Sequence, residues 1–323
     1  MEILVTAAPG GHSGYAYALG YYARMKGLTP HFLVPKGYPW IREKLSRLGE
    51  TIEHPLPRKP AEPLWRTIHR WPLALLSSMT RVTRSYKAVI SCGANFSIPP
   101  SIAGKLKRLK LYNVESIVRI LDTGKTPRLL YHIADKTFLH WPEQLKNYPK
   151  GLVVGPIYEP PTREPYDGGY ILVTAGTLGN KELFDAVVEL DLENVVMQTG
   201  RVDPEPYRRR RPGWRYVTYT PDFDELLAGA SIVVTQFPGM TSATAALAYR
   251  KPVVLVPARH LHLSASLENA RIYAEKIHAV YVDKITPESL EDALEEARGI
   301  EPPSYTNGAE KAVEHVYNDI APG

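Results

Sequence analysis

The chain alternates short apolar runs, rich in β-branched residues, with helical patterns, and this alternation constrains its fold more than any other feature. In the first half, the apolar runs lie at 2–8, 31–34, 88–92, 110–114 and 151–156, and the run at 151–156 is the last of them. In the second half the pattern restarts at 170–176 and continues to a helical segment near 308–318. Strands that alternate with helices favour parallel sheets covered by helices, so we predict an α/β protein.

One stretch interrupts this alternation and indicates two domains. Residues 155–169, GPIYEPPTREPYDGG, are rich in Pro, Gly and charge and lack periodicity, as a linker does. A chain of 323 residues is long enough for two domains that each bury a core. We predict an N-terminal domain at 1–157, a linker at 158–169 and a C-terminal domain at 170–323, with the last helix packed back on the N-terminal domain.

The net charge of +5 is divided unevenly. Residues 1–155 hold 23 Lys and Arg against 9 Asp and Glu (+14), and the remainder holds 16 against 25 (−9). The N-terminal half is therefore expected to meet an anionic partner. An anionic membrane surface fits better than nucleic acid, because no stacking motif or recognition helix accompanies the charge.

The segment 58–87 favours a membrane as that partner. It mixes aliphatic and Trp side chains with cations, and the expected membrane contacts are Trp65, Arg66, Arg70, Trp71 and Arg81. A core-packed helix with snorkelling arginines is the structural alternative. No run reaches the roughly 20 apolar residues of a membrane span, and no signal peptide is evident. With Cys92 as the single cysteine, we expect a peripheral protein on the cytoplasmic face of the cell membrane.

The turns that follow strands are where ligands bind in open α/β sheets. The first turn, APGGHSGY (8–15), has two glycines that allow close backbone approach, followed by a helix start that favours an anion. His12 lies in this turn, and a neutral imidazole can accept a hydroxyl proton near neutral pH. Glu115, after the strand at 110–114, could be the base, orient His12 or bind an acceptor hydroxyl. As structural alternatives, Glu115 is a helix N-terminal residue favoured by the helix dipole, or a partner of Arg119 four residues on.

Two further patterns have structural alternatives of their own. Ser97 and Ser101 follow Gly93 at another strand end, where their hydroxyls could bind phosphate or cap the next helix. The segment 222–224, Asp-Phe-Asp, has the spacing of a metal-binding D-x-D motif, but it opens a helix. Capping explains that segment, so no metal site is predicted.

The stretch LYNVESIVRILDTGKTPRLLYHIADKTFLHW (111–141) resembles the membrane-side subunit of the eukaryotic enzyme that adds the second N-acetylglucosamine to dolichol-linked GlcNAc. The shared pattern is N-x-E-S-x-x-R, a T-G-K turn, L-x-Y-x-x-A-D and a W-x-E close. Residues 170–187 and 235–257 resemble the catalytic subunit of that enzyme, and the MurG family joins both parts in one chain in this order. The resemblance implies the GT-B fold, with two Rossmann-like doubly wound domains facing across a cleft.

The resemblance also implies an activity. Such an enzyme is an inverting glycosyltransferase that moves GlcNAc from UDP-GlcNAc to a polyprenyl or dolichyl diphosphate sugar, here of the GlcNAc-diphosphate-dolichol type, in a β-1,4 linkage. No essential metal or other cofactor is expected. In both families a Gly-Gly-His turn faces the transferred sugar, which favours His12 over Glu115 as the base. Two alternatives stay open: a relative that uses UDP-galactose or UDP-glucuronic acid, and a non-catalytic lipid-binding scaffold.

Binding residues follow from the same resemblance. The acceptor is expected at Gly14, Gly93, Ser97, Asn113 and Arg119. The UDP-sugar is expected at Gly11, Thr174, Gly176, Thr177, Gly239, Met240, Thr241, Ser242, Thr244 and Glu268. The donor turn departs from the pattern, because Gln236-Phe237-Pro238 stand where relatives often have His-Ala-Gly. Ala245 stands near the place of a ribose-binding Glu, which makes Glu268 a candidate substitute.

Overall fold

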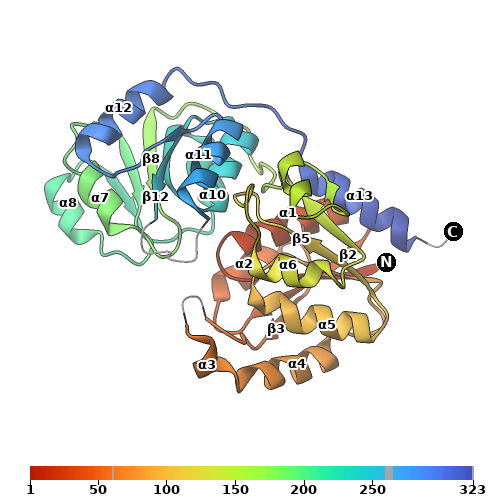
Figure 1. Cartoon of the computed structure of the whole chain (residues 1–323). Helices are drawn as coiled ribbons and strands as arrows, with labels where there is room; N and C mark the ends of the chain where they lie inside the picture. The colour runs from red at the N-terminus through yellow and green to blue at the C-terminus, as the bar shows by residue number, and fades with distance from the viewer. Residues whose placement is uncertain (60–61, 259–264, 322–323) are drawn as a thin grey trace. The chain divides into compact units, whose positions relative to one another are not determined.

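The chain forms two compact units, which we describe separately from a computed structural model of residues 1–59, 62–258 and 265–321 (Figure 1). The first unit comprises Met1–Glu159 with Tyr305–Gly323, and the second comprises Pro160–Ser304. Each unit has one parallel sheet with helices as the connections between its strands.

The sheet of the first unit has seven strands in the described part of the chain, in the order β3-β2-β1-β4-β5-β6-β7. Its strands are β1 (Glu2–Thr6), β2 (Thr29–Pro35), β3 (Thr51–His54), β4 (Ala88–Ser91), β5 (Lys110–Val114), β6 (Lys136–Leu139) and β7 (Leu152–Val153). Its helices are α1 (Gly11–Met25), α2 (Pro39–Ser46), α3 (Leu64–Thr67), α4 (Arg70–Arg81), η1 (Asn95–Ser97), α5 (Ile98–Leu106), α6 (Lys125–Tyr131), η2 (Pro142–Lys146) and α13 (Gly308–Ile320).

The central strands of this sheet are buried on both faces, which explains their continuous apolar sequence. All four residues of β4 are buried, and Leu4 and Leu111 on its two neighbours are fully buried in the same core. The register pairs Thr6 at the end of β1 with Ser91 at the end of β4, and Ser91 with Asn113 on β5. The carboxyl ends of these three strands therefore meet at one edge of the sheet.

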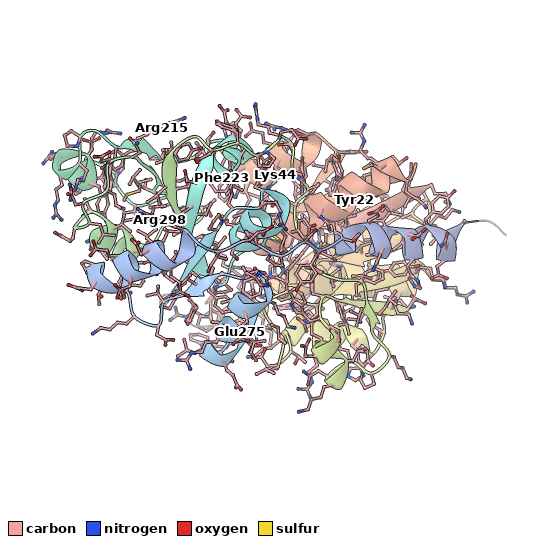
Figure 2. All side chains as sticks on the ribbon, turned by 90° about the horizontal axis from the view of Figure 1, so that it is seen from above. Tyr22, Lys44, Arg215, Phe223, Glu275 and Arg298 are labelled. Carbon is pink, nitrogen blue, oxygen red and sulfur yellow. The ribbon has the colours of Figure 1, made fainter. Side chains whose placement is uncertain are left out.

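The helix α13 packs on the first unit although it follows the second unit in sequence. It contacts α1, and Tyr22 lies on α1 beside it (Figure 2). Burial, reinforced by the charge of Glu310 on α13, raises the pKa of the Tyr22 phenol. The hydroxyl of Tyr112 on β5 donates to Asp319 at 2.5 Å, and Lys110 forms an ion pair with the same carboxylate at 2.9 Å. These contacts hold the end of the chain against the first sheet.

The second unit repeats the plan with six strands among its described residues, in the order β10-β9-β8-β11-β12-β13. Its strands are β8 (Tyr170–Thr174), β9 (Val195–Gln198), β10 (Arg215–Val217), β11 (Ala230–Phe237), β12 (Val253–Pro257) and β13 (Val280–Tyr281). Its helices are α7 (Lys181–Val187), α8 (Glu205–Arg210), α9 (Phe223–Ala228), α10 (Met240–Ala243), the π-helical η3 (Thr244–Ala248), α11 (Leu267–Lys276) and α12 (Pro287–Ala297). Leu172, Val233 and Val254 on its central strands are fully buried.

The predicted α/β class is confirmed, whereas several short elements were not predicted. β3, β6, α6 and α8 are absent from the sequence-based expectation, and the run at 151–156 contributes only the two residues of β7. β3 (TIEH) and β6 (KTFL) are four residues long and carry charge, so neither has the continuous apolar run that identified the central strands.

Candidate active site

The turn between β1 and α1 has the open backbone that its glycines predicted. Gly10 adopts φ +83°, in the left-handed half of backbone space that favours glycine, and no atom lies within 4 Å of a Cβ built there. No side chain caps α1, which begins at Gly11. The Ser13 N–H donates to the Gly10 carbonyl at 3.2 Å, which leaves the N–H groups of Gly11 and His12 for an anionic or polar ligand.

His12 lies in the first turn of α1 and is partly exposed. Its Nδ1 lies 2.7 Å from the carbonyl oxygen of Cys92, which follows β4. A carbonyl can only accept, so Nδ1 carries the proton and a neutral ring has its lone pair on Nε2. Burial lowers the pKa of His12 below its ordinary value, and the carbonyl bond partly opposes this shift. The ring is thus neutral at pH 7 and presents Nε2 as a proton acceptor.

Gly93, expected to bind the acceptor, lies directly against His12. A Cβ added at Gly93 would lie 3.0 Å from both Nδ1 and Cε1 of the ring, and Gly93 has φ +87°. Both the backbone angle and the close approach require glycine here. The structure therefore brings together Gly11, His12 and Gly93, from two turns that lie 80 residues apart.

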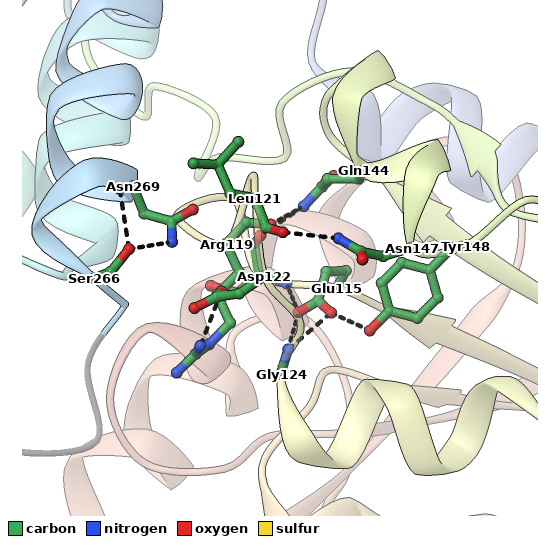
Figure 3. Close-up of polar contacts among 11 residues, drawn as sticks. Glu115, Arg119, Leu121, Asp122, Gly124, Gln144, Asn147, Tyr148, Ser266 and Asn269 are labelled. Atoms are coloured by element: carbon green, nitrogen blue, oxygen red, sulfur yellow. Dashed lines mark hydrogen bonds and ion pairs between the residues drawn. The ribbon is translucent and has the colours of Figure 1, made fainter.

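Glu115 has a structural position that does not fit the expected catalytic role. Its side chain is fully buried, and one carboxylate oxygen accepts from the Ser116 N–H at 2.7 Å. The Gly124 N–H donates to the other oxygen at 3.0 Å, and the Tyr148 hydroxyl donates to that oxygen as well (Figure 3). Burial raises the pKa of Glu115, and these donors oppose the shift. With its oxygens occupied by Ser116, Gly124 and Tyr148, Glu115 ties residues 116–124 to one another and to Tyr148.

Three of the other expected acceptor residues are also interior. The Ser97 hydroxyl is fully buried and donates to the Gly93 carbonyl at 2.6 Å, so it is not available to a phosphate. Asn113 is fully buried and donates to the Pro127 carbonyl at 2.9 Å, and Gly14 is buried within α1. Arg119 is partly exposed and pairs with Asp122 at 3.0 Å. Ser101, considered with Ser97 as a phosphate-binding or capping residue, is also fully buried.

In the second unit, the turn after β8 has two accessible residues among those expected to bind the UDP-sugar. Gly176 has φ +66° and is partly exposed, and Thr177 is exposed. Thr174 is fully buried, and its hydroxyl donates to the Gln198 side chain at 2.5 Å and accepts from the Gly176 N–H at 3.4 Å. Thr174 therefore shapes the turn rather than facing solvent.

In the turn after β11, too, some of the residues expected to bind the UDP-sugar are accessible and others are buried. Gly239 and Thr241 are partly exposed, whereas Met240, Ser242 and Thr244 are buried. The Ser242 hydroxyl donates to the Gly239 carbonyl at 3.1 Å and contacts the Tyr273 hydroxyl at 2.9 Å. The helix that follows this turn is the four-residue α10, which continues into the π-helical η3. Glu268 is exposed in the first turn of α11.

Sequence reasoning missed a group of polar atoms near the carboxyl ends of β8, β9 and β11. The buried atoms Asn180 Nδ2, Thr199 Oγ1, Gln236 Oε1 and Thr244 Oγ1 have no hydrogen-bond partner within the described chain. Buried polar atoms are nearly always hydrogen-bonded to protein or to ordered water, so these four atoms keep bonding capacity for water or a ligand. Polar residues at the ends of buried strands, such as Gln198 at the end of β9 and Thr199 after it, were the available sequence signal.

The five expected membrane residues are exposed to different degrees. Trp65 is 71% exposed, and the Arg66 guanidinium lies 4.8 Å above its ring. Trp71 is partly buried, Arg70 pairs with Glu62, and Arg81 donates to the Glu53 carbonyl at 2.9 Å. Three further apolar side chains on α4 and the α3–α4 junction are strongly exposed: Ile68 (66%), Leu73 (60%) and Leu76 (64%). None of the described helices is both long and apolar enough to span a bilayer.

The Asp-Phe-Asp segment does not cap its helix through a side chain as expected. Asp222 occupies the N-cap position of α9, but no side-chain cap bond is present there. Asp224 accepts from the Thr162 hydroxyl at 2.9 Å. Among the described residues, no three His, Cys, Asp or Glu side chains are grouped so that they could hold a metal ion.

Residues 170–320 match the glycosyltransferase family 28 C-terminal domain. The chain is also similar to the solved structure of MurG from Acinetobacter baumannii, with 17% identity, coverage of 99% of this chain and 98% of that chain, and a TM-score of 0.63. The chain has the GT-B fold. The predicted GT-B class is thus confirmed.

Two further solved structures share this fold. One is Arabidopsis thaliana UGT89C1 complexed with UDP, with 13% identity, coverage of 99% of each chain and a TM-score of 0.68. The other is a UDP-GlcNAc 2-epimerase from Neisseria meningitidis bound to UDP-GlcNAc, with 12% identity, coverage of 98% of this chain and 100% of that chain, and a TM-score of 0.65. Comparison with curated proteins finds no match.

Proposed function

We propose that this GT-B protein is an inverting glycosyltransferase with a UDP-sugar as donor and a lipid-diphosphate-linked sugar as acceptor. The match of residues 170–320 to a glycosyltransferase domain supports the transferase class. The UDP and UDP-GlcNAc in two structures of the same fold support the donor. The observation that carries the proposal is His12, a neutral imidazole with its proton on Nδ1 and its lone pair on Nε2.

The proposed reaction is a single displacement. The acceptor hydroxyl oxygen attacks the anomeric carbon, while the bond from that carbon to the diphosphate oxygen breaks and UDP leaves with the electron pair. Nε2 of His12 takes the hydroxyl proton, and the resulting imidazolium keeps its Nδ1–H bond to the Cys92 carbonyl. One displacement inverts the configuration at the anomeric carbon.

The second unit would hold the donor. Backbone N–H groups of the turns at Gly176 and Gly239, with the exposed Thr177 and partly exposed Thr241, are suited to phosphate oxygens. The unpartnered buried atoms beside these turns would bind the polar groups of the nucleotide or sugar. Neutralisation of the leaving diphosphate by N–H and hydroxyl donors needs no metal, so turnover should survive EDTA.

We propose GlcNAc as the transferred sugar, and a GlcNAc-diphospho-lipid of the dolichol type as the acceptor, in a β-1,4 linkage. The resemblance of residues 111–141 to the chitobiose-forming enzyme supports this assignment. The protein would contribute to the assembly of N-glycan or surface-glycan precursors.

We also propose that the first unit binds the cytoplasmic face of an anionic membrane. Trp65, Ile68, Leu73 and Leu76 are strongly exposed apolar side chains on α3, α4 and their junction. The charge of +14 on residues 1–155 adds attraction for anionic lipid. Such binding would bring the active site to a lipid-linked acceptor.

A donor panel tests the proposal. UDP-GlcNAc, UDP-galactose and UDP-glucuronic acid are each incubated with a short-chain lipid-diphosphate GlcNAc, with and without EDTA, and products are identified by mass spectrometry and NMR. We expect a β-1,4-linked GlcNAc disaccharide, with and without EDTA. A disaccharide with galactose or glucuronic acid alone would replace the donor assignment. Conversion of UDP-GlcNAc to its 2-epimer without acceptor would contradict transfer, and failure to bind UDP in calorimetry would favour a scaffold.

A further inference from the structure

Two glycines of the second unit each lie against the backbone of the other's turn. Gly179 lies in the turn after β8, and Gly200 lies in the turn after β9. A Cβ built on Gly179 would lie 2.3 Å from the Thr199 carbonyl oxygen, and one built on Gly200 would lie 2.5 Å from the Gly176 carbonyl oxygen. Such distances leave no room for a side chain at either position. We call Gly179 and Gly200 the glycine seat.

The backbone of the seat also requires glycine, and one of its turns is anchored to the sheet. Gly179 has φ +74° and Gly200 has φ +61°, both in the left-handed region. The Thr199 N–H, directly before Gly200, donates to the Val217 carbonyl of β10 at 2.8 Å. The turn after β9 is therefore a fixed support for the turn at 176–179.

The position of the Gly176 carbonyl sets the direction of the next N–H group. The peptide bond between Gly176 and Thr177 is trans, so its carbonyl oxygen and its N–H lie on opposite sides of the bond. The Gly176 oxygen is the nearest heavy atom to the Cβ position of Gly200. The Thr177 N–H, which belongs to the same peptide plane, therefore points away from Gly200. The Gly179 N–H donates to the same Gly176 oxygen at 3.3 Å and helps to hold this plane.

Two successive N–H groups of this turn are unpaired. Among the residues that the structure describes, neither the Thr177 N–H nor the Leu178 N–H has a hydrogen-bond partner. Thr177 is exposed, and Leu178 is 49% exposed. Successive free N–H groups in a turn bind anions, so this turn is suited to phosphate oxygens.

We propose that Gly200, together with Gly179, is a positioning residue that directs the Thr177 N–H away from the supporting turn, so that it binds the diphosphate of the UDP-sugar. A side chain at Gly200 would displace the Gly176 carbonyl, and the Thr177 N–H would move with it. The identity of the ligand rests on the proposed function, whereas the geometry of the turn does not.

The nearest side-chain contact does not supply this control. The Thr174 hydroxyl accepts from the Gly176 N–H at 3.4 Å, but that N–H belongs to the preceding peptide plane. The plane between Gly176 and Thr177 is instead contacted by Gly200 and bonded by the Gly179 N–H.

Substitution of Gly200 tests the seat, and Gly169 supplies the matched control. Gly169 directly precedes β8, has φ +71°, and a Cβ there would meet nothing within 4 Å. Gly200→Ala and Gly169→Ala therefore share the backbone strain, but only Gly200→Ala places an atom against the turn at 176–179. In Gly200→Asn the left-handed angle is better tolerated while the Cβ remains, so this variant should behave as Gly200→Ala does.

Comparison of UDP with uridine, which lacks phosphate, separates a displaced turn from a general loss of structure. Both ligands are titrated into the full chain. We expect Gly200→Ala and Gly200→Asn to bind UDP about 10- to 100-fold more weakly than the parent, as the loss of a hydrogen bond to a charged group implies. Their affinity for uridine should stay within about twofold of the parent, because uridine makes no contact through phosphate. Gly169→Ala should bind both ligands as the parent does.

One measurement on the parent does not depend on the Gly200 variants. In threonine-labelled full-length protein, the Thr177 amide signal is assigned by its loss in Thr177→Ser. Addition of inorganic diphosphate should shift this signal. An unshifted signal would overturn the proposal whether or not the Gly200 variants fold.

Two results with folded variants would also overturn it. One is equal UDP affinity in Gly200→Ala and Gly169→Ala, and the other is an equal loss of UDP and uridine affinity in Gly200→Ala. If the parent binds UDP and diphosphate as expected but has no transferase activity, the proposed function fails and the glycine seat stands.

Discussion

Substitution of Gly93 by Ala tests the contact that positions His12, and the chain offers a control with the same backbone angle. Gly93 and Gly37 both have φ +87°, but a Cβ at Gly37 would meet nothing within 4 Å, whereas one at Gly93 would lie 3.0 Å from His12 Nδ1 and Cε1. Both substitutions carry the left-handed strain of about 1–2 kcal/mol. At about 2–4 °C per kcal/mol for a domain of this size, each should lower Tm by roughly 2–8 °C.

Only Gly93→Ala should also displace the imidazole. Ordinary contacts of a Cβ are at least about 0.4 Å longer than 3.0 Å, so the ring must shift by a few tenths of an ångström. That shift strains the 2.7 Å bond from Nδ1 to Cys92. We expect kcat to fall at least about tenfold in Gly93→Ala, within the 10²- to 10⁴-fold contribution of a general base. Steady-state turnover and thermal unfolding of both variants measure this. Equal turnover in Gly93→Ala and Gly37→Ala would refute the reasoning.

Four further predictions follow from the structure. Because burial lowers the pKa of His12, kcat/KM should decrease on the acidic side with an apparent pKa below 6.5. An apparent pKa above 7 for this acidic limb would argue against His12 as the base. Glu115→Gln should cost about 1–3 kcal/mol in unfolding free energy and leave kcat within about threefold, whereas a hundredfold loss at unchanged Tm would restore a catalytic role. Burial lowers the pKa of His54 and of His140 to about 4, so as the pH falls below 6.5 these rings are protonated in the unfolded state before they are protonated in the folded state. The free energy of unfolding, measured with urea, should therefore decrease by about 2 kcal/mol per ring between pH 7.5 and pH 5. A constant free energy of unfolding over this range would contradict the prediction. Leu73→Ser should weaken sedimentation with phosphatidylglycerol vesicles more than Leu267→Ser, an equally exposed position (60%) in the second unit; equal effects would argue against the membrane surface.

The fold was predictable because its central strands have an apolar sequence that is recognisable without the structure. β1, β4 and β8 are continuous apolar runs followed by turns, since parallel strands buried on both faces need apolar residues throughout. β3 and β6 were missed because edge or near-edge strands of four residues can carry charge. Tertiary pairing, which a local pattern does not contain, makes them strands.

The site was predictable only in part, for a related reason. The glycines of the first turn place His12 at the start of α1, but its partner is the backbone carbonyl of Cys92, and a carbonyl leaves no sequence signature. Glu115, Ser97 and Asn113 stand at strand or loop ends and carry ligand-like groups. Inside the fold, those groups bond to backbone N–H and carbonyl groups of the loops that they support. Residue type alone does not distinguish a polar group that holds a loop from one that holds a substrate.

The account depends most on the transfer of the acceptor proton to His12, and one measurement tests this directly. Turnover of UDP-GlcNAc with a short-chain lipid-diphosphate GlcNAc is compared for the parent and His12→Gln, with UDP affinity measured by calorimetry on both. The account predicts that kcat falls about 10²- to 10⁴-fold in His12→Gln while UDP affinity is unchanged. Unchanged turnover in His12→Gln would contradict it.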